Sequence, residues 1–85
     1  MEAVVQYSTK TGEAQNVYIS ASAANEYGFD SSTIIKCIRG DRMTHGESRW
    51  ARLPQTQLGK IKEYKGKRIP RAKFSAMGLK VSPIK

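Results

Sequence analysis

Apolar positions near the start of the chain form two short runs, which predict two strands. In residues 4–7, valine, glutamine and tyrosine side chains would point alternately to the two faces of a strand. Turn-forming residues follow at 8–12, and a second apolar run occupies residues 17–19. We therefore expect a β-hairpin with strands at 4–7 and 17–19.

The next apolar residues are spaced as in two short helices. Ser20 suits an N-cap, and Gly28 suits the left-handed position that ends a helix. A second helix is expected over residues 31–39, capped by Asp30 or Ser31. Its buried stripe, at spacings of three and four, comprises Ile34, Cys37 and Ile38.

A third strand is expected at residues 48–53, with Trp50 packed on the helices and Pro54 marking a boundary. The predicted fold class is therefore α+β. Residues 1–53 would form a small β-β-α-α-β module with a helix-turn-helix. Residues 54–85 would form a basic C-terminal arm, and a chain ending at Gln57 would keep its fold.

The formal net charge of +8 lies in the last third of the chain. Residues 1–59 carry six basic and six acidic side chains, whereas residues 60–85 carry nine basic and one acidic. A neutral module followed by a basic segment suits a polyanionic partner, although such a tail could also serve only solubility. Apolar residues interleave with the lysines, which indicates that part of the segment docks or folds, or does so on binding a partner.

The C-terminal segment also matches the first module at an offset of 50 residues. The identical pairs are Ile19 with Ile69, Gly28 with Gly78, Ser32 with Ser82 and Ile34 with Ile84. The segment is either a truncated second module or a basic tail with chance similarity. A truncated module could be completed by another chain, as in a homodimer.

A larger set of residues resembles a known family. The set comprises Val5-Gln6-Tyr7, Gly12, Ala23-Ala24, Gly28, Ser31-Ser32-Thr33-Ile34, Cys37, Gly40, His45-Gly46 and Trp50. In order and spacing it resembles the nuclease-associated modular DNA-binding domain, which follows the catalytic domains of phage and intron-encoded homing endonucleases. The resemblance covers residues 4–53 and implies a DNA-contacting helix at 31–39.

The chain departs from that family at two points. Ile35 occupies a position that is usually polar in the family. It could contact a thymine methyl group, or it could mark a protein interface. The chain also carries no nuclease domain.

Catalytic chemistry is not expected. An HNH-type nuclease needs several histidines, and His45 is the only one. His45 lies in a polar loop, where we expect a turn residue or a phosphate contact. Cys37 falls on the buried stripe and has no partnering base. No Cys/His set suits zinc and no acidic cluster suits magnesium, so we expect no enzyme, no cofactor and no metal site.

The expected compartment is the cytoplasm, of a phage host cell or in a bacterial nucleoid. No run of about 18 apolar residues could cross a membrane, and no secretory signal opens the chain. The single cysteine cannot form an internal disulfide, which suits a reducing compartment.

We therefore expect a small, non-catalytic protein that binds double-stranded DNA as a phage-encoded regulator or targeting module. The expected contacts to base edges or nearby phosphates are Ser31, Ser32, Thr33 and Lys36. The expected phosphate contacts are Arg39, Arg42, Lys65, Lys67, Arg68, Arg71 and Lys73. The alternative is a phage-encoded inhibitor that binds a host nuclease or polymerase through the helix pair, Ile35 and the arm.

Overall fold

The computed structural model of the chain describes residues 3–83. Its first elements are strands β1 (Val4–Ser8) and β2 (Ala14–Tyr18), helix α1 (Ala21–Ala24), 3₁₀-helix η1 (Asn25–Tyr27), helix α2 (Ser31–Arg39) and strand β3 (Ser48–Arg52). The remaining elements are helix α3 (Gln55–Leu58), strand β4 (Arg68–Pro70), 3₁₀-helix η2 (Arg71–Lys73) and helix α4 (Phe74–Met77). The predicted α+β class and the β-β-α-α-β order of the first module are confirmed.

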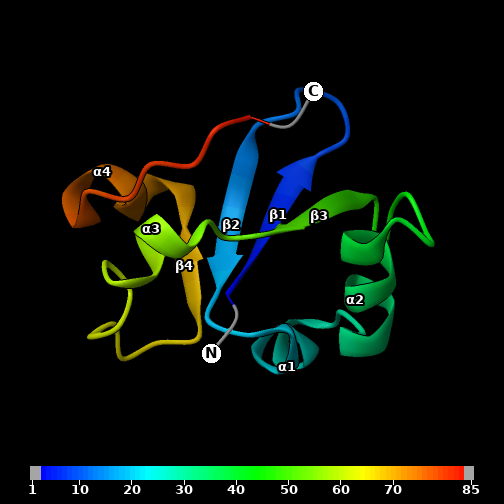
Figure 1. Cartoon of the computed structure of the whole chain (residues 1–85), viewed down its shortest axis with the longest axis horizontal. Coiled ribbons are helices and arrows are strands. Elements are labelled where there is room, and N and C mark those ends of the chain that lie inside the picture. Colours follow the sequence, from blue (N-terminus) through cyan, green and yellow to red (C-terminus); the bar gives the residue numbers. More distant parts are fainter. Residues whose placement is uncertain (1–2, 84–85) are drawn as a thin grey trace.

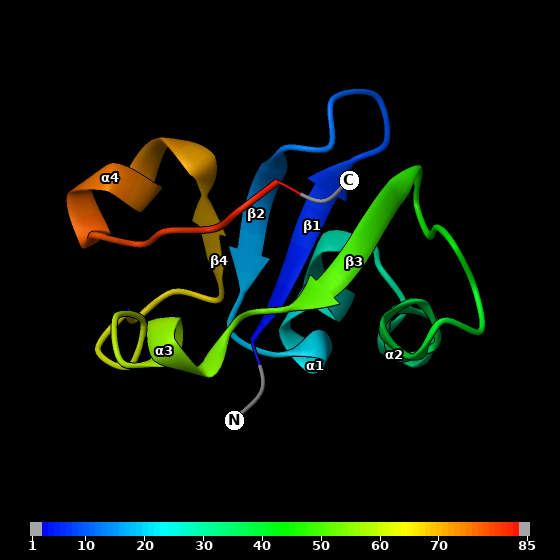
Figure 2. The ribbon, with the colours of Figure 1, turned by 45° about the horizontal axis from the view of Figure 1, so that its top comes forward.

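The four strands form one antiparallel sheet in the order β3-β1-β2-β4 (Figure 1). The second strand spans residues 14–18, earlier than the predicted 17–19, because the ladder with β1 extends back to Ala14 through the polar Gln15 and Asn16. Figure 2 shows the C-terminal segment passing in front of β4 and reaching β2, with α1 behind the sheet. The molecule therefore has three layers.

One face of the sheet is covered by α1, η1 and α2. Tyr18 is completely buried there, and its ring lies 5.7 Å from that of Trp50 and 6.1 Å from that of Phe29. Ile34 reaches the same cluster from α2, as the predicted stripe requires. Cys37 and Ile38 also pack there but are only partly buried.

The opposite face is covered by the segment that the sequence presented as an arm. Ile61, Ile69 and Leu79 from this segment are buried against Val5 and Val17 of the central strands. Burying a whole isoleucine side chain contributes roughly 1.5–3 kcal/mol, so these contacts are a major part of the core of so small a protein. A chain ending at Gln57 would lack these three buried side chains, so the structure argues against the expectation that it keeps its fold.

The segment also adds the edge strand β4. Val17 lies opposite Ile69, and the N–H of Ile19 donates to the carbonyl of Lys67 at 3.1 Å. Bonded and non-bonded pairs alternate in an antiparallel ladder, so Pro70, opposite Asn16, falls at a non-bonded position. The missing N–H of proline is not needed at that position.

The offset of 50 residues is visible in the backbone. The N–H of Phe29 donates to the carbonyl of Ala24 at 3.2 Å, and the N–H of Leu79 donates to that of Phe74 at 2.8 Å. Each bond closes a helix end at a left-handed glycine. These glycines are Gly28 (φ 89°) and Gly78 (φ 67°). A strand, a short helix and this cap thus recur, while the match at Ile84 lies outside the described residues.

Replacement of Ile69 tests whether the C-terminal segment is part of the core. Ile69 is 0% exposed, so Ile69→Ala leaves a cavity between β4 and the central strands. The expected loss of unfolding free energy is about 2–4 kcal/mol, measured by urea unfolding. Lys62→Ala is the control, since Lys62 is exposed on the same segment. Equal stability of both variants would mean that the segment is a loose arm.

Candidate nucleic-acid interface

Helix α2 is fixed at its start by a capping interaction. The carboxylate of Asp30 accepts hydrogen bonds from the hydroxyl of Thr33 at 2.7 Å and from its backbone N–H at 2.9 Å. Both bonds stabilise the charged carboxylate and so hold the pKa of Asp30 below its usual value. The bond from the Thr33 hydroxyl contributes most to this lowering. The helix ends at Gly40, which has a φ of 90°. Both ends therefore lie where the sequence predicts them.

His45 joins the start of α2 to the sheet. Its Nε2 accepts a hydrogen bond from the backbone N–H of Asp30 at 2.9 Å, which places the ring proton of the neutral imidazole on Nδ1. Its carbonyl accepts from the indole N–H of Trp50 at 3.0 Å, and its ring meets the edge of Phe29. His45 is thus a turn residue that positions α2, and its Nε2 is already bonded to the backbone of Asp30.

The outward face of α2 carries a stripe of four residues, which we call the α2 stripe. It comprises Ser32, Ile35, Lys36 and Arg39. All four are exposed, and Ile35 is 43% exposed although it is apolar. Their spacing of three and four residues keeps them on one side of the helix.

Two other residues predicted to contact bases, Ser31 and Thr33, donate hydrogen bonds within the start of the helix. The backbone N–H of Ser31 donates to the side chain of Asn25 at 2.9 Å, and the hydroxyl of Thr33 is bonded to Asp30. Short polar side chains at a helix start commonly satisfy the unpaired backbone groups there. Here the capping side chains are those of Asn25 and Asp30, and Ser31 and Thr33 are the residues that donate to them.

Two arginines flank the end of α2. Nε of Arg39 lies 3.8 Å from the carboxylate of Asp41, with both side chains exposed. Nε of Arg42 donates to the carbonyl of Thr44 at 2.7 Å, which orders the loop after the helix. Because an exposed ion pair is weak, Arg39 can exchange Asp41 for another anion.

Several basic residues predicted to bind phosphate contact other parts of the molecule. Lys67 pairs with Glu26 of η1, and Arg71 pairs with Glu13 at 2.7 Å. The guanidinium of Arg68 lies 4.3 Å from the ring centre of Tyr27, and the ammonium of Lys73 lies 5.7 Å from that of Tyr64. The contacts of Lys67, Arg68 and Arg71 tie the C-terminal segment to the N-terminal part.

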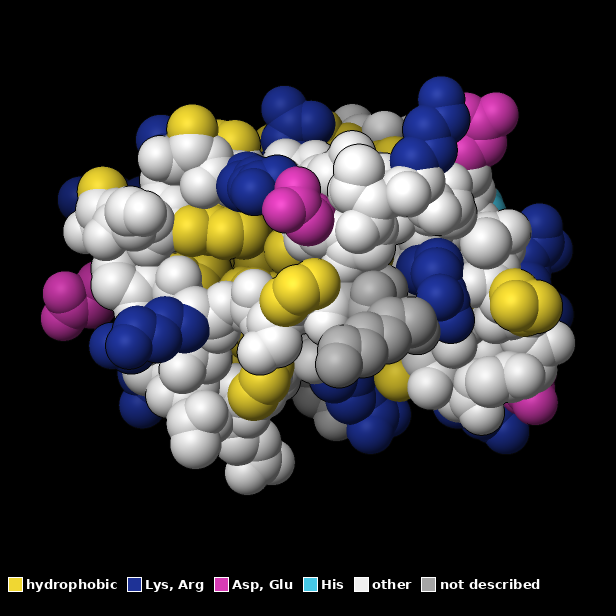
Figure 3. All heavy atoms as spheres, turned by 90° about the horizontal axis from the view of Figure 1, so that it is seen from above, with side chains coloured by type: hydrophobic (Ala, Val, Ile, Leu, Met, Phe, Trp, Pro, Cys, Tyr) yellow, Lys and Arg dark blue, Asp and Glu magenta, His cyan; other side chains and the backbone are white. Residues whose placement is uncertain are grey.

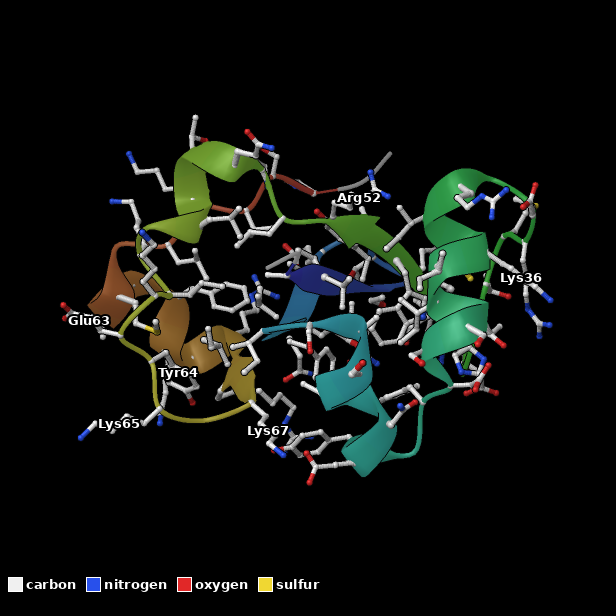
Figure 4. All side chains as sticks on the ribbon, turned by 60° about the horizontal axis from the view of Figure 1, so that its bottom comes forward. Lys36, Arg52, Glu63, Tyr64, Lys65 and Lys67 are labelled. Carbon is white, nitrogen blue, oxygen red and sulfur yellow. The ribbon has the colours of Figure 1, made fainter. Side chains whose placement is uncertain are left out.

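The basic residues predicted to bind DNA lie at both ends of the molecule. Lys36 extends from α2 at one end of the molecule, whereas Lys65 extends from the loop after α3 at the other end (Figure 4). The longest dimension of the molecule is 31 Å. Figure 3 shows basic side chains scattered over the face in view, with apolar side chains gathered over the C-terminal segment. The residues predicted to contact DNA from α2 and from the C-terminal segment therefore lie at opposite ends of the molecule.

A polar network occupies the part of the sheet that the helices leave uncovered. The side chain of Gln6 donates to Ser48 at 2.8 Å and accepts from Tyr18 and Asn16, each at 3.0 Å. An open cleft of about 770 Å³ lies beside it, lined by side chains such as Ser8, Thr9 and Lys10. The network satisfies its own hydrogen bonds, which indicates a structural role.

Burial raises the pKa of the Cys37 thiol, which lowers its reactivity at neutral pH. Among residues 3–83, no three His, Cys, Asp or Glu side chains are grouped to hold a metal ion. None of the helices in that range is long and apolar enough to span a bilayer.

Comparison with known proteins gives no match: no family model, curated protein or solved structure is similar to this chain. The resemblance to the nuclease-associated DNA-binding domain therefore stays a prediction, based on the residues quoted for it.

The Asp30 cap predicts a pH dependence of stability. Because the folded-state pKa of Asp30 is lowered, its charge stabilises the fold above the unfolded-state value of about 3.9. That contribution is lost as the pH falls through the lower folded-state pKa. The stability difference between the native chain and Asp30→Asn should therefore shrink below about pH 4, as measured by urea unfolding at a series of pH values.

Thr33→Val provides the matched comparison, since it removes the hydroxyl that contributes most to the shift. In chains that carry Thr33→Val, the stability difference caused by Asp30→Asn should therefore change less with pH. A difference between native and Asp30→Asn chains that stays constant from pH 6 to pH 2 would contradict the capping role.

Proposed function

We propose that this protein binds double-stranded DNA by placing the α2 stripe in the major groove. The observation that carries the proposal is the combination of a fixed helix and an exposed face. Helix α2 is held by the Asp30 cap and His45, and its outward side remains exposed within the described structure. A rigid helix with an exposed polar and basic face is suited to groove recognition.

The order of the preceding elements matches that of a helix-turn-helix. Helix α1 and η1 are followed by the left-handed Gly28 and then by α2. In that motif the second helix enters the major groove, which is wide enough to admit an α-helix. The small side chain of Ser32 near the start of α2 permits close approach to base edges.

Each member of the α2 stripe has a chemical role in this proposal. Lys36 and Arg39 would bind phosphate oxygens or the acceptor groups of guanine. Ile35 would pack on a thymine methyl group. The net charge of +8 would attract DNA over a longer range, without requiring that the C-terminal lysines touch it.

Replacing one lysine at each end of the molecule tests which end binds. Lys36→Ala and Lys65→Ala remove the same charge from exposed positions. Lys36→Ala should weaken binding to a fluorescent 20-base-pair duplex about fivefold to tenfold, with the slope of log affinity against log salt smaller by about 1. Lys65→Ala should change the affinity less than twofold.

The melting temperatures of both variants should stay near that of the native chain, since neither side chain is buried. Equal losses of affinity would indicate diffuse electrostatic binding. A larger loss for Lys65→Ala would place the interface at the opposite end from α2.

Replacing Ile35 distinguishes DNA contact from the alternative of host-protein inhibition. Because Ile35 is 43% exposed, Ile35→Ser should leave the fold intact. If Ile35 meets a thymine methyl, the variant should lose about fivefold in affinity at thymine-containing sites and little elsewhere, as measured by competition between duplexes. Unchanged DNA binding together with loss of a stoichiometric host-protein complex would favour the inhibitor.

A further inference from the structure

The loop between α2 and β3, residues 40–47, extends past α2 at one end of the molecule in both Figure 1 and Figure 2. Lys36 extends from α2 at the same end (Figure 4). The α2 stripe lies on the side of the helix turned away from the sheet, since Ile34 on the other side packs into the core. The loop and the α2 stripe are therefore placed to contact the same partner.

The start of this loop is attached to α2, and its tip is a tight turn. The N–H of Asp41 donates to the carbonyl of Lys36 at 2.9 Å. Nε of Arg42 then donates to the carbonyl of Thr44 at 2.7 Å, two residues further along the chain. Met43, which lies between these two bonded residues, is therefore held at the tip of the loop.

The return of the loop is attached to both the sheet and the helix layer. The backbone groups of His45 and Ser48 pair at 2.9 and 3.1 Å. Gly46 runs directly against Phe29, because a Cβ at this position would lie only 2.6 Å from the ring. The loop is thus fixed on both sides of its tip, which suits a preformed contact with a ligand.

Met43 projects from this fixed tip. Its side chain is 77% exposed, compared with 43% for Ile35 and 40% for Tyr27. A single exposed apolar side chain is common on protein surfaces and by itself indicates nothing. The position of Met43 is more informative, because the loop is anchored on both sides and cations lie beside it.

Arginines lie beside Met43 without neighbouring carboxylates. Arg42 precedes it in the chain, and both residues line a groove of about 500 Å³ together with Arg49 of β3. The acidic residues of the loop interact elsewhere: Asp41 lies 3.8 Å from an arginine of α2, and Glu47 lines the polar cleft on the uncovered part of the sheet. Proteins place apolar wedges and arginines of this kind in the DNA minor groove.

The lengths of the helix and the loop fit two neighbouring grooves of DNA. Helix α2 has nine residues and is about 13.5 Å long, so its centre lies about 7 Å from its end. The four residues from that end to the loop tip extend at most about 14 Å. Half a turn of DNA, about 17 Å, separates the centres of adjacent major and minor grooves. The tip is therefore within reach of the neighbouring minor groove.

We propose that Met43 enters the minor groove of the bound duplex, beside the major groove that receives α2, and inserts between two adjacent base pairs. Arg42 and Arg49 would bind the phosphates that border this groove. An inserted apolar side chain unstacks a base step and bends the duplex.

The insertion would give the protein sequence preference without hydrogen bonds to bases. TA and CA/TG steps unstack most easily, so Met43 would select a site that contains one of them. This inference rests on the proposed DNA binding, and it adds the second groove and the sequence feature read there.

Energy transfer across a short duplex measures the bend. The full chain is added to a 16-base-pair duplex that has a central TA step and a dye at each end. The native chain should raise the transfer efficiency, because bending brings the two ends together. Met43→Ala should lose at least half of this increase and bind about fivefold more weakly, whereas Met43→Leu should keep both, since leucine also acts as a wedge.

Netropsin, which fills the minor groove of A·T base pairs, locates the contact. It should weaken binding of the native chain to an A·T-rich duplex at least fivefold. Binding of Met43→Ala should change less than twofold, because that variant has already lost the insertion. Since the Met43 side chain is exposed, the melting temperatures of both Met43 variants should match that of the native chain.

Equal energy transfer with the native chain and Met43→Ala would overturn this inference, and the effect of Lys36→Ala on affinity would show separately whether α2 binds DNA. A native chain that bound no duplex at low salt would overturn the inference together with the proposed function. Unchanged bending by Met43→Ala, combined with loss of a host-protein complex, would assign Met43 to a protein interface instead.

Discussion

Two adjacent residues of β2 set the main constraint on this structure. Val17 and Tyr18 are both completely buried, and consecutive side chains of a strand point to opposite faces of a sheet. The central strands must therefore be covered on both faces. Tyr18 packs with the helix layer, and Val17 packs with the C-terminal layer. A chain of 85 residues meets this requirement only by using nearly its whole length.

This constraint changes how the positive charge is interpreted. The C-terminal lysines and arginines are carried by a segment whose apolar residues, such as Ile69, cover the sheet. Some of its cations reach back to Glu13 and Glu26, which belong to the nominally neutral part of the chain. The charge is therefore distributed over a folded surface. That arrangement suits long-range attraction of a polyanion, with selective contacts made elsewhere.

The local features of the first module could be predicted from sequence because short-range rules govern them. Gly28 and Gly40 end helices at the left-handed positions expected of glycine, and Ile34 lies on the buried side of α2. The sequence did not predict that the C-terminal segment supplies part of the core, because that depends on long-range packing. The apolar residues among the lysines indicated that part of the C-terminal segment docks or folds. Ile61 and Leu79 follow no helical or strand periodicity, however, so the pattern did not show that both are buried against the sheet.

In the candidate sites, too, features set by the helix period could be predicted, whereas features set by side-chain orientation or long-range pairing could not. The exposure of Lys36 and Arg39 followed from the helix period. The hydrogen bond from the Thr33 hydroxyl to the capping residue Asp30 depends on the orientation of that side chain, which the period does not give. The order of the strands could not be anticipated, because the strand that forms each edge of the sheet depends on the pairing of segments far apart in the chain.

Mapping a DNA duplex onto the ¹⁵N-labelled full chain tests the central claim most directly. The account predicts that the largest amide shifts fall between residues 31 and 40, with residues 59–67 at the opposite end changed little. It also predicts that signals from the buried Ile69 stay in place, because the two layers remain joined when DNA binds. The largest shifts in residues 59–67, with α2 unaffected, would contradict the assignment of α2 as the DNA-binding helix.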